Sequence, residues 1–195
     1  GEGGRLAVAH GGQMFVLMEE DVVARFWHSA DGGATWSERS SSWLLAPLQR
    51  HAAAQLPSGR VVVTGGRDTA DRQPLGSIWI SDDGARTWQR ATAHAVWGPR
   101  ADHSMNLCPS TGHVVIVGGD QGFSPAHLVA DVWTSGDGVS WEQLQSDAPF
   151  GPINLHASVA LADQLLILGG LDEYYDSLST VWSSPDCGSS WALVT

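Results

Sequence analysis

Four segments share the pattern Trp-x-Ser-x-Asp, and their recurrence decides the fold: Trp27-His28-Ser29-Ala30-Asp31, Trp79-Ile80-Ser81-Asp82-Asp83, Trp133-Thr134-Ser135-Gly136-Asp137 and Trp182-Ser183-Ser184-Pro185-Asp186. Each is followed by a glycine and then by a serine or threonine with a second tryptophan, at Trp36, Trp88, Trp141 and Trp191. These second tryptophans are 52, 53 and 50 residues apart. A repeat with a period near 50 residues sets the architecture of a whole chain.

A second motif recurs in the same phase, namely an apolar run closed by a glycine pair at 61–66, 114–119 and 165–170. A histidine precedes each run, at His51, His103 and His156. Consecutive apolar residues predict a strand that is buried on both faces. The first module is degenerate, because Met14 to Leu17 is followed by Met18 and Glu19, and Gly4 stands in place of the histidine.

Each module predicts four short strands, which in the second module lie at about 51–56, 60–65, 77–81 and 87–91. β-Branched and aromatic residues fill these segments, turn residues separate them, and helical periodicity is absent. Four-stranded sheets repeated around an axis form a β-propeller. We therefore predict an all-β chain with a single propeller domain over 1–195. Its blades are expected at about 4–50, 51–102, 103–155 and 156–195.

The sequence also resembles known families. The histidine, apolar run, glycine pair and later tryptophan look like the kelch repeat, and Pro99-Arg100-Ala101-Asp102-His103-Ser104 is similar to the start of a kelch module. The pattern from Ser29 to Trp36, and again from Ser184 to Trp191, resembles the Asp-box of sialidases and related propellers. The second copy has Ala85 where the glycine belongs, and the third copy is one residue short. The resemblance implies a propeller, and kelch-like propellers are mostly interaction scaffolds.

We expect the repeated residues to be structural. Aspartate followed by glycine between two strands predicts a hairpin in which the carboxylate accepts backbone N–H bonds and a hydroxyl bond. We expect the three repeat histidines to form structural hydrogen bonds rather than to hold an axial metal, and we expect no cofactor. The residues assigned to these hairpins are Ser29, Asp31, Trp36, Ser81, Asp83, Trp88, Ser135, Asp137, Trp141, Ser184, Asp186 and Trp191.

The order of the strands sorts the loops between two faces. The 1–2 and 3–4 turns are short and stereotyped on one face, whereas the 2–3 and 4–1 loops on the other face vary. Function usually resides on variable loops held by a rigid scaffold. Arginine and aromatic residues are enriched at binding interfaces. The predicted binding residues are Trp43, Arg67, Arg72, Trp97, Arg100, Asp120, Phe123, His127, Tyr174 and Tyr175, with capping of the blade core as the alternative role of Trp43, Trp97 and Phe150.

Charge and composition exclude some classes of partner. The 195 residues include 21 acidic and 10 basic ones, all of the latter arginine, for a net charge of -11. This balance disfavours nucleic acids and anionic membrane surfaces. No apolar run approaches the ~18 residues of a membrane span. Cys108 and Cys187 are too few to predict a disulfide framework, so the compartment stays open.

Three functions compete. The favoured prediction is a non-catalytic binding or scaffold propeller that recognises a protein or glycan through the face of the 2–3 and 4–1 loops. The alternative is a glycan-processing enzyme of sialidase-like type, for which Arg67, Arg72 and Arg100 with Asp68 and a tyrosine supply the residue types. A copper oxidase resembling galactose oxidase is disfavoured, because the two tyrosines are adjacent and both cysteines fall on the opposite face.

Ring closure is also left open by the sequence. Four modules predict a four-bladed propeller, part of a larger propeller of six to eight blades, or a half-ring that a second chain completes. The first residues include no initiator methionine and the first module is degenerate, which favours the partial arrangements. Self-association that completes a ring is one expected interaction.

Overall fold

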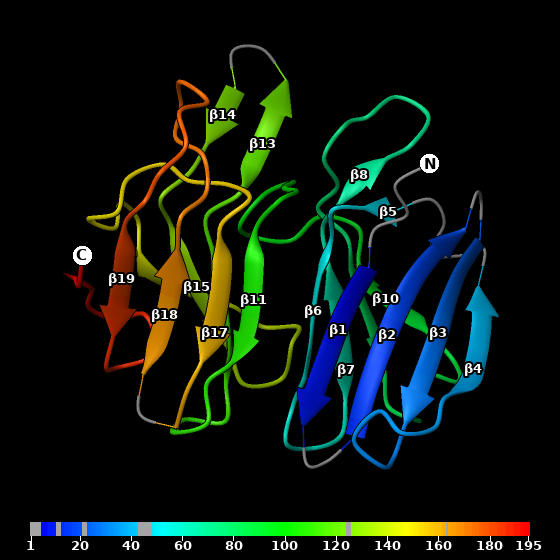
Figure 1. The fold of residues 1–195 in the computed structure, drawn as a ribbon. Helices are drawn as coiled ribbons and strands as arrows, with labels where there is room; N and C mark the ends of the chain where they lie inside the picture. The colour runs from blue at the N-terminus through cyan, green and yellow to red at the C-terminus, as the bar shows by residue number, and fades with distance from the viewer. Residues whose placement is uncertain (1–4, 11–12, 21–22, 43–47, 124–125, 163) are drawn as a thin grey trace.

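In the computed structural model, the backbone is described for residues 5–10, 13–20, 23–42, 48–123, 126–162 and 164–195. Over these residues the chain forms strands and no α-helix, and therefore no helix that is long and apolar enough to cross a membrane. Four antiparallel sheets of four strands each follow one another along the chain (Figure 1). This arrangement is a four-bladed β-propeller, as the repeat predicts.

Each sheet, or blade, takes its strands in sequence order. Blade 1 contains β1 (Arg5–His10), β2 (Gln13–Glu20), β3 (Val23–Ser29) and β4 (Ser37–Ser42). Blade 2 contains β6 (Ala52–Gln55), β7 (Val61–Thr64), β9 (Ile78–Ser81) and β10 (Gln89–Thr92). Blade 3 contains β11 (Ser104–Leu107), β12 (Val114–Val117), β15 (Val132–Ser135) and β16 (Glu142–Gln145). Blade 4 contains β17 (Ala157–Ala160), β18 (Leu165–Leu168), β19 (Val181–Ser184) and β20 (Ala192–Leu193).

Two short ribbons stand beside the blades, β5 (Leu48–Gln49) with β8 (Arg67–Asp68) and β13 (Asp120–Phe123) with β14 (Ala126–Leu128). Within the blades, the first and second strands pair in continuous register. The third and fourth strands of blades 1 to 3 shift register at a bulge. In blades 1 to 3 the pairing of the first two strands is therefore the more regular part.

The blades pack face to face through three apolar clusters. The first strands β1, β6, β11 and β17 are neighbours in that order. Both β7 and β12 are buried along their whole length, because each lies between two other blades. This placement explains why their residues are apolar in succession rather than in alternation. Burying such surface supplies most of the stability of the fold.

Blade 4 leaves one sheet face partly open. In β18, Leu165 and Ile167 are buried against blade 3, whereas Leu168 on the opposite face is 37% exposed. Val159 on β17 lies on the same open face and is 40% exposed. The contacts between first strands place blade 1 and blade 4 at the two ends of the series, and Figure 1 shows them on opposite sides of the molecule. The open face of blade 4 therefore has the apolar character of an inter-blade surface without a blade against it.

One disulfide joins the last two blades, a pairing that the sequence did not predict. Cys108 follows β11 in blade 3 and Cys187 follows β19 in blade 4, and their Cα atoms are 5.9 Å apart. The two cysteines are 79 residues apart in sequence, so only the stacking of neighbouring blades brings them together. A cross-link over such a loop stabilises a fold by about 2–4 kcal/mol.

Candidate functional site

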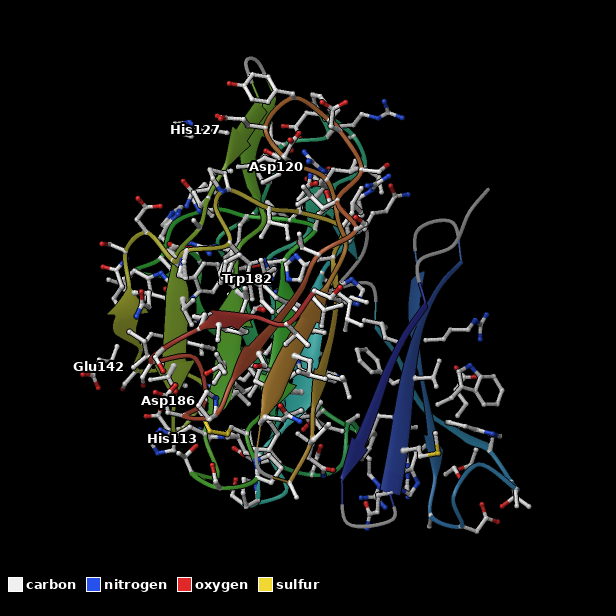
Figure 2. The ribbon with its side chains drawn as sticks, turned by 60° about the vertical axis from the view of Figure 1, so that its left-hand side comes forward. His113, Asp120, His127, Glu142, Trp182 and Asp186 are labelled. Atoms are coloured by element: carbon white, nitrogen blue, oxygen red, sulfur yellow. A yellow bond between two sulfur atoms is a disulfide. The ribbon has the colours of Figure 1, made fainter. Side chains whose placement is uncertain are left out.

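The two ends of the blades carry different chemistry. Figure 2 shows His113 and Asp186 toward one end of the sheets and Asp120 and His127 toward the other. The first end holds the four Trp-x-Ser-x-Asp turns, called here the Ser–Asp hairpins. The second end holds the 2–3 and 4–1 loops and is called here the axial face.

The Ser–Asp hairpins are closed by one recurring set of hydrogen bonds. In blade 1, the Ser29 hydroxyl donates to Asp31 at 2.7 Å, and the Thr35 amide and hydroxyl donate to the same carboxylate at 2.9 and 2.6 Å. Blade 4 repeats this set with Ser184, Asp186 and Ser190 at 2.9, 2.7 and 2.6 Å. Each carboxylate thus serves the turn that contains it.

The pKa values of these aspartates follow from the same bonds. Hydrogen bonds from Thr35 hold the pKa of Asp31 at about 2. Burial opposes ionisation of Asp83, but hydrogen bonds from Thr87 and Ser81 lower its pKa to about 2. The pKa values of Asp137 and Asp186 are also lowered by hydrogen bonds that outweigh burial. A carboxylate that is ionised and fully engaged in this way is poorly suited to exchange protons with a substrate.

The second tryptophan of a hairpin reaches across to the preceding blade. The Trp88 ring lies 4.4 Å from that of Phe26, and the Trp191 ring lies 5.3 Å from that of Phe150. Among the described residues no blade packs on the outer side of blade 1, and Trp36 there is 39% exposed. The hairpins therefore both close their own blade and fasten it to its neighbour.

On the axial face, residues from three blades line a cavity of about 270 Å3. They come from fixed positions of the repeat. The residue before each repeat histidine contributes Arg50, Asp102 and Leu155, and the residue after each glycine pair contributes Arg67, Asp120 and Leu171. Gln49 and Asn154 come from two positions before a histidine, and Asp68, Arg72 and Tyr175 come from 2–3 loops. We call this cavity the axial pocket.

The backbone builds the axial pocket in the same way at the start of blades 2, 3 and 4. Arg50, Asp102 and Leu155 all have left-handed φ angles, of 59°, 58° and 53°. The Asp102 amide donates to the Arg50 carbonyl at 3.0 Å, and the Leu155 amide donates to the Asp102 carbonyl at 3.1 Å. Arg72 and Tyr175, at φ 60° and 64°, also line the pocket. Five of the seven non-glycine residues described with positive φ therefore surround this one cavity, and such strain clusters at functional sites.

The glycine pairs allow the end of each second strand to approach closely the backbone before the next repeat histidine or the same one. A Cβ on Gly170 would lie 2.7 Å from the Asn154 carbonyl oxygen, and one on Gly119 would lie 2.9 Å from that of Ala101. Their φ angles of 102° and 110° also favour glycine. The pairs thus place the residue that follows them at the rim of the axial pocket.

Ion pairs hold the charged walls of the pocket. Arg67 bonds Asp120 at 2.6 Å and Asp102 at 3.3 Å, and Arg50 bonds Asp102 at 3.0 Å. The side chains of Arg67, Asp102 and Asp120 are only 12%, 2% and 7% exposed. Pairs this deeply buried fix their side chains in one arrangement, because separating them leaves an uncompensated charge.

One buried polar atom of the pocket has no partner. Asn154 is 3% exposed, and its backbone bonds Leu171 in both directions. Its Oδ1 atom makes no hydrogen bond with any residue that the structure describes. A buried unsatisfied acceptor is costly, and it calls for an explanation such as a site for a bound molecule.

Two of the repeat histidines lie next to this region and are neutral. His103 Nε2 is 2.9 Å from the Thr64 hydroxyl, and His156 Nε2 is 2.8 Å from the Ser104 hydroxyl. Burial lowers the pKa of His156 to about 4 and that of His103 well below its usual value. Within the described residues, no three histidine, cysteine or acidic side chains are grouped so as to hold a metal ion.

The structure brings together four of the ten predicted binding residues, Arg67, Arg72, Asp120 and Tyr175. Tyr174 is 75% exposed and His127 is also exposed, but neither lines the axial pocket. Phe123 ends β13, and Trp43 lies outside the described residues.

Two other predicted binding residues, Trp97 and Arg100, are buried and do not line the axial pocket. Trp97 is 2% exposed and packs in the apolar cluster between blades 2 and 3. Arg100 is 0% exposed and forms a two-pronged ion pair with Asp131 at 2.7 and 2.9 Å. Both residues therefore lie in the interior. Trp97 is covered by the apolar cluster, and Asp131 from the next blade neutralises the charge of Arg100.

Sequence reasoning missed Arg50, Asp102, Asn154 and Gln49. Their position in the repeat could have identified them, because each stands one or two residues before a repeat histidine. In a propeller, residues at the same position of successive repeats lie side by side around the axis, so the repeat alone is enough to predict that these residues meet.

Comparisons with known proteins support the class of fold. Protein-family models give no match to this chain, and neither do curated protein sequences. Among solved structures, the chain is similar to YjhT, with a TM-score of 0.79 and 12% sequence identity. The similarity covers 98% of this chain and 63% of that one, so the chain spans less than two thirds of YjhT's length. At this identity the likeness concerns the fold alone.

Proposed function

We propose that this protein is a non-catalytic binding module that recognises a protein or glycan partner through the axial pocket. The observation that carries the proposal is the buried, unpartnered Asn154 Oδ1 in a cavity whose buried carboxylates, Asp102 and Asp120, are already paired. Binding sites are concave and hold a few well-placed polar groups on a largely rigid frame. The axial pocket is concave, and ion pairs among Arg50, Arg67, Asp102 and Asp120 fix part of its polar lining.

The arrangement of charge supports binding over glycan processing. A sialidase-like mechanism needs arginines that are free for a substrate carboxylate. Arg67 is already paired with two aspartates, and Arg100 is buried against Asp131. Arg72 is the remaining member of that predicted set and is exposed. Turnover of a fluorogenic sialoside would overturn the non-catalytic assignment.

A glycan array combined with a pull-down tests the proposal. Replacing Asn154 with leucine removes the unpartnered acceptor, and the chain's other asparagine, Asn106, provides the matched control because it bonds Ser158 between blades 3 and 4. We expect Asn154→Leu to abolish capture of the partner and Asn106→Leu to retain it. Equal capture by the wild type and Asn154→Leu would remove the axial pocket from the proposal.

Self-association through the end blades belongs to the same proposal. The occupant we propose for the open face of blade 4 is blade 1 of a second copy, which presents the exposed Trp36 that other blades bury against a neighbour. Leu168 would then be covered as Val117, its counterpart in blade 3, is. The mass of the protein in solution tests this interface: a discrete dimer supports it, and a monomer at all concentrations contradicts it.

A further inference from the structure

The charges that line the axial pocket balance one another. Three arginines, Arg50, Arg67 and Arg72, face three aspartates, Asp68, Asp102 and Asp120. The most buried of them are committed to each other, with Arg67 shared between Asp102 and Asp120. A ligand with a net charge would add an uncompensated charge here or separate a buried pair, and both are unfavourable. The electrostatics of the pocket thus favour an uncharged ligand.

The unpartnered Asn154 Oδ1 defines what that ligand offers. An amide oxygen accepts hydrogen bonds, so the group that meets it must donate one. An ionised carboxylate has no hydrogen to donate, whereas a hydroxyl group does. A hydroxyl also accepts, so neighbouring hydroxyls of the same ligand suit the guanidinium of Arg72 at the rim.

The remaining wall of the pocket is apolar. Tyr175 is 60% exposed and Leu155 is 50% exposed, and Leu171 lies beside them. An aromatic ring presents a flat apolar face together with a polar hydroxyl. A molecule that satisfies this wall needs an apolar face of its own as well as hydroxyl groups. A cavity of about 270 Å3 is at the small end of ligand sites, which suits a single ring.

We propose that the axial pocket binds one uncharged sugar ring, whose hydroxyl donates to Asn154 Oδ1 and whose C–H face packs on Tyr175. This inference rests on the proposed function and names the ligand class of the same site. It follows from the balanced charges, the unpartnered acceptor and the apolar wall taken together.

Calorimetric titration with two sets of probes tests the inference. The neutral set is the methyl glycosides of glucose, galactose and mannose, and the charged set is glucuronate and inorganic phosphate. At least one neutral glycoside should bind, and glucuronate and phosphate should not. Affinity for the neutral glycoside should change less than about twofold between about 0.05 M and 0.5 M salt, because no ion pair forms with the ligand.

Variants locate the binding. Asn154→Leu should weaken it by about tenfold or more, which is the loss expected for one buried hydrogen bond. Tyr175→Asn should weaken it by about threefold to tenfold, since asparagine tolerates the left-handed backbone but offers no ring face. Tyr174→Asn is the matched control and should leave the affinity unchanged. Circular dichroism confirms that each variant is folded.

The outcomes separate the two proposals. Binding of glucuronate or phosphate alone, with a steep salt dependence, overturns the neutral-sugar inference and leaves a binding function in place. Neutral binding that survives both Asn154→Leu and Tyr175→Asn overturns the assignment to this pocket. Binding of none of the probes, with a protein captured in the pull-down, overturns the sugar and retains the module. If neither probes nor partners bind, both proposals fail.

Discussion

The Ser–Asp hairpins and the axial face are built from the same repeat, yet side chains are kept at the first and vary at the second. At the hairpins a serine and an aspartate recur in every blade, and in every blade the serine hydroxyl donates to the aspartate. At the axial face the backbone conformation is the same, but the side chains at one position are Arg50, Asp102 and Leu155. Side chains that recur in every blade stabilise the fold. Positions that keep one backbone conformation but differ in side chain form the candidate site.

The largest effect is expected from a residue between these two regions. Arg100→Met should lower the free energy of unfolding by about 3–5 kcal/mol, because it leaves Asp131 buried beside the apolar core without its partner. Urea denaturation measures the loss, with the exposed Arg90→Met as control. A decrease in the free energy of unfolding of less than about 1 kcal/mol would show that the buried ion pair between Arg100 and Asp131 does not stabilise the fold.

Reduction of the disulfide should have the next largest effect. Replacing Cys108 and Cys187 with alanine should lower the free energy of unfolding by about 2–4 kcal/mol, since the cross-link closes a long loop between blades 3 and 4. Ligand affinity in the folded variant should not change, because the bond lies at the hairpin end. A changed affinity would mean that the two regions are coupled.

Acid should weaken the fold through the buried histidines. The pKa of His156 is about 4 in the folded chain and 6.5 for the unperturbed group, so the unfolded chain binds its proton more readily. The free energy of unfolding therefore falls as the pH drops from about 6.5 to about 4, by about 3 kcal/mol for this residue. Denaturation series at several pH values should show a smaller decline in His156→Gln. The exposed His113→Gln should retain the full decline, and an identical curve for all three proteins would contradict burial of a neutral His156.

The hairpin aspartates should have smaller effects. Asp186→Ala removes hydrogen bonds from Ser184 and Ser190 and should cost about 1–2 kcal/mol. The exposed Asp147→Ala is the control. Because the folded pKa values of Asp31 and Asp83 are about 2, the stability they supply is complete above about pH 4 and is lost toward pH 2. Loss of ligand affinity in Asp186→Ala at unchanged melting temperature would reverse the assignment.

Much of the fold follows from the sequence, because the repeat signals are local. Tryptophan, serine and aspartate close one hairpin, and a glycine pair ends one buried strand, so each motif can be interpreted by itself. The site is less accessible to such reasoning. Arg100 meets Asp131, and Arg67 meets Asp102 and Asp120, only where neighbouring blades meet. Whether an arginine on a variable loop contacts a ligand or forms a buried ion pair depends on such contacts between modules.

The most direct test of the separate roles of the hairpins and the axial pocket measures stability and affinity in the same two variants. Asn154→Leu replaces an unpartnered buried acceptor with an apolar side chain, so the free energy of unfolding should be unchanged or higher. Titration with the neutral glycoside should show that this variant has lost its binding by about tenfold or more. Asp186→Ala should show the reverse, with lower stability and full affinity. An Asn154→Leu variant that is destabilised and binds as well as the wild type would contradict the account.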